Sequence, residues 1–89
     1  MLNRAFIITG LVQGVFFRDS TKKVALSLGL KGSAINLPNG TVKVSVYGAN
    51  KDINTLKKWL IEGPDLAKVE SVTEVDIDEH LELNYFKVG

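Results

Sequence analysis

The sequence predicts a single α+β domain in which two helices cover one face of a mostly antiparallel sheet. Two observations support this fold class. Segments with the apolar–polar alternation of strands are followed along the chain by segments with helical periodicity, and this order repeats. Glycine and proline separate these segments at short intervals, and 89 residues are enough for only one hydrophobic core. We therefore expect one domain over residues 1–89.

The first third of the chain predicts a strand and a helix. Residues 5–8 (Ala-Phe-Ile-Ile) form a short apolar run of strand length. Residues 19–28 follow a helical pattern, with Asp19 and Ser20 suited to the start of the helix and Gly29 to its C-terminal cap. The stripe that faces the core of the domain is formed by Phe17, Thr21, Val24 and Leu28.

A hairpin and a second helix follow. Residues 34–37 lead into the turn Pro38-Asn39-Gly40, in which proline sets φ and Gly40 supplies a left-handed residue, and residues 41–47 then alternate cleanly. Asn50 is a candidate N-cap for the second helix, which Gly63-Pro64 ends. Its core stripe is formed by Ile53, Leu56 and Leu60, with Trp59 alongside.

The last quarter of the chain predicts two more strands. The fourth strand contains Val69, Val72, Val75 and Ile77, and its imperfect alternation indicates a bulge. Residues 85–88 predict a short terminal strand. The order is βαββαβ plus this strand, which with right-handed crossovers is the ferredoxin-like sandwich. That fold carries enzymes, RNA binders and small-molecule sensors, so the function has to be argued from the site.

Composition and charge exclude several classes of function. The chain has no cysteine and a single histidine, His80, which excludes thiolate chemistry, iron–sulfur clusters and a histidine-rich metal centre. A net charge of +1 argues against a general polyanion-binding surface. The strand over residues 42–47 lacks the aromatic pair that an RNA-binding module on this fold needs. The acidic stretch around His80, formed by Asp76, Asp78 and Glu79, is typical of a solvated loop rather than a metal site.

The N-terminal apolar stretch is too short for a signal peptide or a membrane span. We therefore expect a cytoplasmic protein that binds neither membranes nor nucleic acid.

The loop between the first strand and the first helix, residues 10–18 (GLVQGVFFR), is the clearest candidate for a binding site. Free N–H groups and the positive end of the dipole at a helix start attract anions. Gly14 lets successive N–H groups converge, and Arg18 adds a planar guanidinium that suits two phosphate oxygens. Two interpretations fit: a site for one tetrahedral dianion, or a glycine turn followed by a solvated arginine. Short glycine loops are common, so the motif by itself favours the second.

Asn36 is expected to face this loop from across the sheet. The first two strands of a βαβ unit run parallel, so their C-terminal ends share one edge. If the third strand lies between them, Asn36 is two strand spacings, roughly 10 Å, from the loop. Side chains from both sides can then reach one phosphate and one water. The alternative is an amide that flanks the turn and bonds to its own hairpin.

Four blocks of the sequence resemble the acylphosphatase family in order and spacing. They are Val12-Gln13-Gly14-Val15-Phe16-Phe17-Arg18, Leu28-Gly29-Leu30-x-Gly32, Asn36-x-x-x-Gly40-Thr41-Val42 and Gly63-Pro64. The resemblance extends over essentially the whole chain and favours the anion site over the purely structural interpretations. The sequence departs from the family at three positions. Ser33 stands where an aromatic residue is usual, Ile35 where a basic or polar residue is usual, and Leu37 where threonine is usual.

The resemblance implies an acylphosphatase, a hydrolase that cleaves the carboxyl–phosphate bond of acyl phosphates without metal or cofactor. It implies that Asn36 orients the attacking water, that Thr41 supports the site, and that the phosphoryl group is held by Arg18 and the loop residues Gln13, Gly14, Val15, Phe16 and Phe17. We expect a monomer, with inorganic phosphate as product and inhibitor. The alternative is a non-catalytic phosphate-binding or regulatory module on the same fold.

Overall fold

The computed structural model describes residues 2–76 and 86–89. Its elements, in chain order, are β1 (Leu2–Leu11), α1 (Phe17–Ser27), β2 (Lys31–Asn36), β3 (Val42–Gly48), α2 (Asn50–Glu62), β4 (Lys68–Val75) and β5 (Phe86–Val88). This is the predicted order. Ile77, the last residue of the predicted fourth strand, and Tyr85, the first residue of the predicted terminal strand, lie outside the described residues. Asp78, Glu79 and His80 lie outside them as well.

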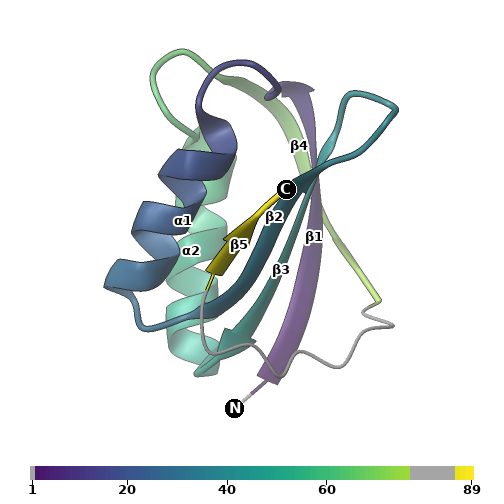
Figure 1. Ribbon diagram of the computed structural model, residues 1–89. Coiled ribbons are helices and arrows are strands. Elements are labelled where there is room, and N and C mark those ends of the chain that lie inside the picture. The colour runs from purple at the N-terminus through teal and green to yellow at the C-terminus, as the bar shows by residue number, and fades with distance from the viewer. Residues whose placement is uncertain (1, 77–85) are drawn as a thin grey trace.

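The five strands form one sheet in the order β4-β1-β3-β2-β5, and both helices lie against the same face (Figure 1). Strand β3 runs antiparallel between β1 and β2, as the argument for Asn36 requires. Strand β5 pairs in parallel with the outer edge of β2. The sheet is therefore mostly antiparallel, and the C-terminal ends of β1, β2 and β5 meet at one edge.

The core lies between the helices and the sheet. In α2 the buried residues are Ile53, Leu56 and Leu60, the stripe that the sequence predicts. In α1 the buried residues are Phe17, Thr21 and Ala25, whereas Val24 and Leu28 pack against the core while partly exposed. The sheet contributes every second residue of β3, namely Val42, Val44 and Val46, all fully buried. Each large apolar side chain in this layer stabilises the fold by about 1.5–3 kcal/mol.

Both predicted helix starts need correction. Helix α1 begins at Phe17, so Asp19 and Ser20 lie in its first turn rather than at its start. The buried ring of Phe17 draws this residue into the helix, and this packing outweighs the capping preference of the polar residues. Helix α2 has Ala49 at its N-cap position, without a side-chain cap. Asn50 is already helical, and its side-chain oxygen accepts a hydrogen bond from Arg4 instead of capping the helix.

The predicted bulge lies in β4, where it pairs with the end of β1. Thr9 is opposite Ser71 but Gly10 is opposite Val69, so Glu70 is the extra residue. Gly10 has φ +118°, and a Cβ atom there would lie 2.1 Å from the carbonyl oxygen of Lys68. Only glycine fits this approach, and the bend leads the chain into the candidate binding loop.

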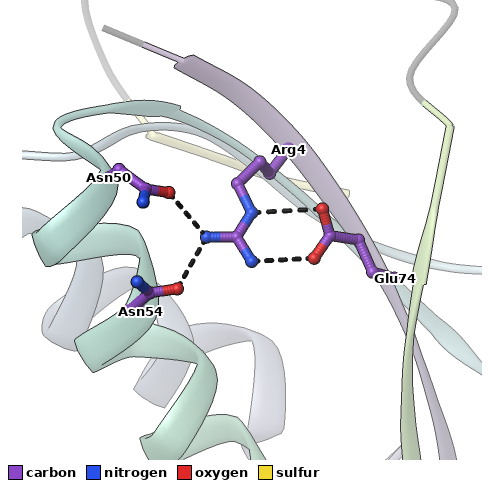
Figure 2. A network of polar contacts seen from close by, with 4 residues as sticks. All are labelled: Arg4, Asn50, Asn54 and Glu74. Carbon is purple, nitrogen blue, oxygen red and sulfur yellow. Dashed lines mark hydrogen bonds and ion pairs between the residues drawn. The ribbon is translucent and has the colours of Figure 1, made fainter.

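Arg4 ties β1, β4 and α2 together through one polar network (Figure 2). Its Nε and Nη2 atoms donate to the two carboxylate oxygens of Glu74, at 3.1 and 2.7 Å. Its Nη1 atom donates to the side-chain oxygens of Asn50 and Asn54, at 2.9 and 2.7 Å. The guanidinium also lies 5.4 Å from the ring centre of Phe6. The bidentate ion pair between Arg4 and Glu74 joins elements that are far apart in the sequence.

The Arg4–Glu74 pair predicts a dependence of stability on pH. The hydrogen bond from Arg4 holds the pKa of the Glu74 carboxyl below its ordinary value. Ionised Glu74 therefore stabilises the fold above the pKa of the unfolded chain, and this contribution is lost as the pH falls through the folded pKa. We expect the free energy of unfolding to fall more for the parent than for Glu74→Gln between pH 7 and about pH 3. The difference is small, since the Glu74 side chain is 42% exposed.

Urea unfolding of both proteins at the two pH values measures this difference. Glu70→Gln is the matched control, because Glu70 is an exposed carboxyl on the same strand. An equal loss of stability in the parent and in Glu74→Gln would contradict the assignment.

Candidate active site

The loop of residues 12–16 joins β1 to α1 and is shaped by two left-handed residues. Gly14 has φ +75°, and Phe16, at the N-cap position of α1, has φ 60°. Val12 and Phe17 anchor the two ends of the loop in the core, each about 1% exposed. The chain between them is thereby curled back over the start of the helix.

The backbone N–H groups of this loop are available to a ligand. Phe16 supplies no side-chain cap to α1. Within the described part of the chain, the N–H groups of residues 14–17 donate to no other protein group, whereas the carbonyl of Phe16 accepts from Ser20 N at 3.0 Å. Unpaired N–H groups at a helix start, together with the helix dipole, favour an anion.

Arg18 and Asn36, the two predicted catalytic residues, meet at one backbone oxygen. The Nη1 atom of Arg18 donates to the carbonyl oxygen of Gly89, and the backbone N–H of Asn36 donates to the same oxygen at 3.0 Å. In return, Gly89 N donates to Ala34 O at 3.0 Å, so the end of β5 is bound to β2 on both sides of Ile35. The guanidinium of Arg18 is thus held at the edge of the sheet where β2 ends.

The side-chain oxygen of Asn36 has an unusual environment. Asn36 Oδ1 is buried and has no hydrogen-bond partner in the protein. A buried acceptor without a partner costs about 1–3 kcal/mol, so the side chain is not kept for stability. This contradicts the alternative in which the Asn36 amide bonds to its own hairpin. Asn36 Oδ1 is thus an unpaired acceptor on the residue whose backbone N–H shares Gly89 with Arg18.

Gln13 connects the loop to the hairpin that follows Asn36. Its Nε2 atom donates to the carbonyl oxygens of Leu37 and Thr41, both at 2.9 Å. Thr41 does not contact Asn36 with its hydroxyl group, which donates instead to Asn39 Oδ1 at 2.6 Å. The Gln13 side chain therefore links the loop to the hairpin, whereas the Thr41 side chain bonds only within the hairpin.

A pocket of about 110 Å³ opens between the loop and the end of the sheet. Four of the predicted residues line it, namely Gly14, Phe16, Phe17 and Arg18, together with Val12, Asp19 and Val88. Gln13, Val15, Asn36 and Thr41 were predicted for the site but do not line this pocket. Val88 and Gly89 belong to the site without having been predicted for it, because the pairing of the terminal strand cannot be read from its own residues.

The comparisons with known proteins decide the family. A sequence model described as Acylphosphatase matches residues 4–88. The chain belongs to the acylphosphatase family. It is 41% identical over 88 residues to the acylphosphatase of Pasteurella multocida (strain Pm70), covering 99% of this chain and 98% of that protein. The predicted resemblance is confirmed.

Solved acylphosphatase structures agree with this assignment. An acylphosphatase from Coxiella burnetii is 36% identical, with a TM-score of 0.85 over 98% of this chain and 90% of that one. The crystal structure of acylphosphatase from Bacillus subtilis is 24% identical and shares the fold, with a TM-score of 0.92 over 100% and 99% of the two chains.

Residues 2–76 and 86–89 contain no cluster of three or more histidine, aspartate or glutamate side chains arranged to hold a metal ion. None of their helices is long and apolar enough to cross a membrane.

In this acylphosphatase-family chain, Gly14 and Gly29 form a matched pair for testing the loop. Gly14 has φ +75° and Gly29 has φ +72°, and a Cβ atom at either position would meet nothing within 4 Å. Valine at either position strains the backbone by a similar amount, about 1–2 kcal/mol. We expect only Gly14→Val to weaken phosphate binding, by roughly 10- to 150-fold, the value of one hydrogen bond to a charged group.

Phosphate titration by calorimetry, beside thermal unfolding, measures both effects. Similar stability losses with unequal phosphate affinities are expected for Gly14→Val and Gly29→Val. Unchanged phosphate affinity in folded Gly14→Val would show that the loop does not bind the anion.

Proposed function

We propose that this protein is an acylphosphatase that hydrolyses the carboxyl–phosphate bond of acyl phosphates, giving a carboxylate and inorganic phosphate. In this proposal the N–H groups of the loop and the Arg18 guanidinium hold the phosphoryl group. Asn36 aligns the attacking water. Neither a metal ion nor a cofactor takes part.

The observation that carries the proposal is the shared contact of Arg18 and Asn36 with Gly89. It keeps a cation and an amide with a free acceptor together at the edge of the sheet, although they lie on different elements. The cation and the loop amides stabilise charge on the phosphoryl oxygens. The amide oxygen accepts a hydrogen bond from water. Phosphoryl transfer needs little more than positioning and charge stabilisation.

The chemistry of the substrate explains why few groups are needed. The leaving group is a carboxylate, a weak base, so no protein group has to protonate it. Water attacks phosphorus as the bond from phosphorus to the carboxyl oxygen breaks, and the bonding electrons leave with the carboxylate. Asn36 orients the water without taking its proton, which we assign to a phosphate oxygen of the substrate.

Hydrolysis of benzoyl phosphate in the presence of a chelator tests the proposal. We expect turnover to survive chelation, because amides and Arg18 supply the positive charge. Inorganic phosphate should inhibit in competition with the substrate, since it occupies the same loop. Activity that is lost in chelator and restored by a divalent cation would count against the mechanism. Phosphate binding without hydrolysis would show that the protein is a binding module rather than an enzyme.

We also propose that the chain acts as one domain, as a monomer, and in the cytoplasm. The family match over residues 4–88 supports the single domain, and the absence of cysteine is compatible with a reducing compartment. Sedimentation equilibrium measures the mass of the particle directly.

A further inference from the structure

Phe16 combines two features that are unfavourable for folding. It is the one non-glycine residue with positive φ in the described part of the chain, at φ 60°. It is 74% exposed, more than any other large apolar residue that the structure describes. A left-handed backbone costs a residue with a Cβ atom about 1–2 kcal/mol, and glycine would avoid this cost. Because the ring contributes little burial in return, folding does not explain its presence.

Phe16 lies at the pocket that contains Arg18. Phe16, Gly14 and Arg18 all line this pocket, and Val88 of β5, itself 37% exposed, lines it as well. The polar part of the site is formed by the loop N–H groups and the guanidinium. Phe16 and Val88 add exposed apolar surface to the same opening. A ligand that fills the pocket therefore meets an anion site and apolar side chains together.

The pocket is too small to enclose a whole organic substrate. Its volume is about 110 Å³, whereas pockets that bury organic ligands occupy roughly 300–1,000 Å³. A phosphoryl group bound at the loop is enough to fill this volume. The organic part of an acyl phosphate then has to leave the pocket across the residues around its opening.

We propose that Phe16 is a specificity-determining residue that packs against the acyl group of the substrate and favours apolar, above all aromatic, acyl phosphates. This inference rests on the proposed acylphosphatase activity. The left-handed backbone turns the side chain of Phe16 out of the core, while the neighbouring Phe17 is buried. An aromatic ring gains contact area and stacking energy against another flat ring that it cannot gain against a methyl group.

Steady-state kinetics with benzoyl phosphate and acetyl phosphate test the proposal. The variants are Phe16→Ala and Phe16→Leu. The matched control is Leu26→Ala, which removes an exposed apolar side chain from the opposite end of α1. For Phe16→Ala we expect kcat/KM for benzoyl phosphate to fall roughly 10-fold or more, typical of losing one apolar contact with the substrate. Acetyl phosphate hydrolysis and inhibition by inorganic phosphate report on the loop itself, and we expect both to fall less than benzoyl phosphate hydrolysis, because the N–H group of residue 16 remains.

The variants separate acyl recognition from damage to the loop. Phe16→Leu keeps an apolar side chain at the same backbone position, so we expect a loss with benzoyl phosphate between those of the parent and Phe16→Ala. Equal losses with both substrates would overturn the proposal, as would no loss with either, and a loss in Leu26→Ala matching that of Phe16→Ala would do the same. If the parent hydrolyses neither substrate, the proposed function itself fails, and this result is distinct from a parent that is active without preference.

Discussion

Arg18→Ala is expected to weaken phosphate binding and to abolish most turnover. The phosphoryl group is anionic in the ground state and in the transition state, so the guanidinium acts in both. Removing one positioned donor from an active site typically lowers the rate by roughly 10²–10³-fold. The fold should survive, because Arg18 is only partly buried and the bond from Asn36 N to Gly89 remains. Isothermal titration with phosphate, steady-state kinetics and thermal unfolding measure the three effects.

Two further variants show whether the loss comes from geometry or from net charge. Arg18→Lys keeps the charge but not the planar fork, so we expect activity between that of the parent and that of Arg18→Ala. Lys51→Ala removes an exposed cation just after β3, at the end of the sheet opposite the loop. It should bind phosphate as the parent does. If Lys51→Ala and Arg18→Ala weaken binding equally, a general electrostatic attraction is responsible.

Asn36→Ala is expected to lose turnover while phosphate binding stays close to that of the parent. The side chain matters once water is aligned for attack, and phosphate alone does not need it. The substitution keeps the backbone N–H that donates to Gly89 and removes a buried oxygen without a partner. We therefore expect Asn36→Ala to be at least as stable as the parent, with a rate roughly 10²–10³-fold lower.

Asn39→Ala is the matched control in the same hairpin. Asn39 Oδ1 accepts from the backbone N–H and the hydroxyl of Thr41, at 3.1 and 2.6 Å, so its loss loosens the turn without removing the proposed water ligand. We expect Asn39→Ala to lower stability and to retain most of the activity. If Asn36→Ala turned over substrate like the parent, the role assigned to Asn36 would be wrong.

The two active-site variants together distinguish an enzyme from a binding module. An enzyme that works as proposed shows a binding defect in Arg18→Ala and a purely catalytic defect in Asn36→Ala. A module that only binds phosphate shows the first defect and has no turnover to lose. The comparison needs both variants, because Arg18 alone contributes to binding in either case.

Much of the fold follows from short stretches of sequence. The stripe of Ile53, Leu56 and Leu60 is buried as predicted, because helical periodicity is a property of neighbouring residues. The turn at Pro38 to Gly40 also follows locally: Gly40 has φ +90°, and its N–H donates to Leu37 O. The glycine loop with Arg18 was recognisable for the same reason, since its residue types are consecutive.

The order of the elements, their core-facing sides and the position of the loop therefore follow from the amino-acid sequence. Which groups come into contact depends on the tertiary structure. Gly89 reaches Arg18 across 71 positions, through a parallel pairing of β5 with β2 that three residues of strand cannot specify. Arg4 takes the side chain of Asn50 away from its capping role across 46 positions. Periodicity and turn chemistry act over a few residues, whereas these contacts depend on the chain being folded.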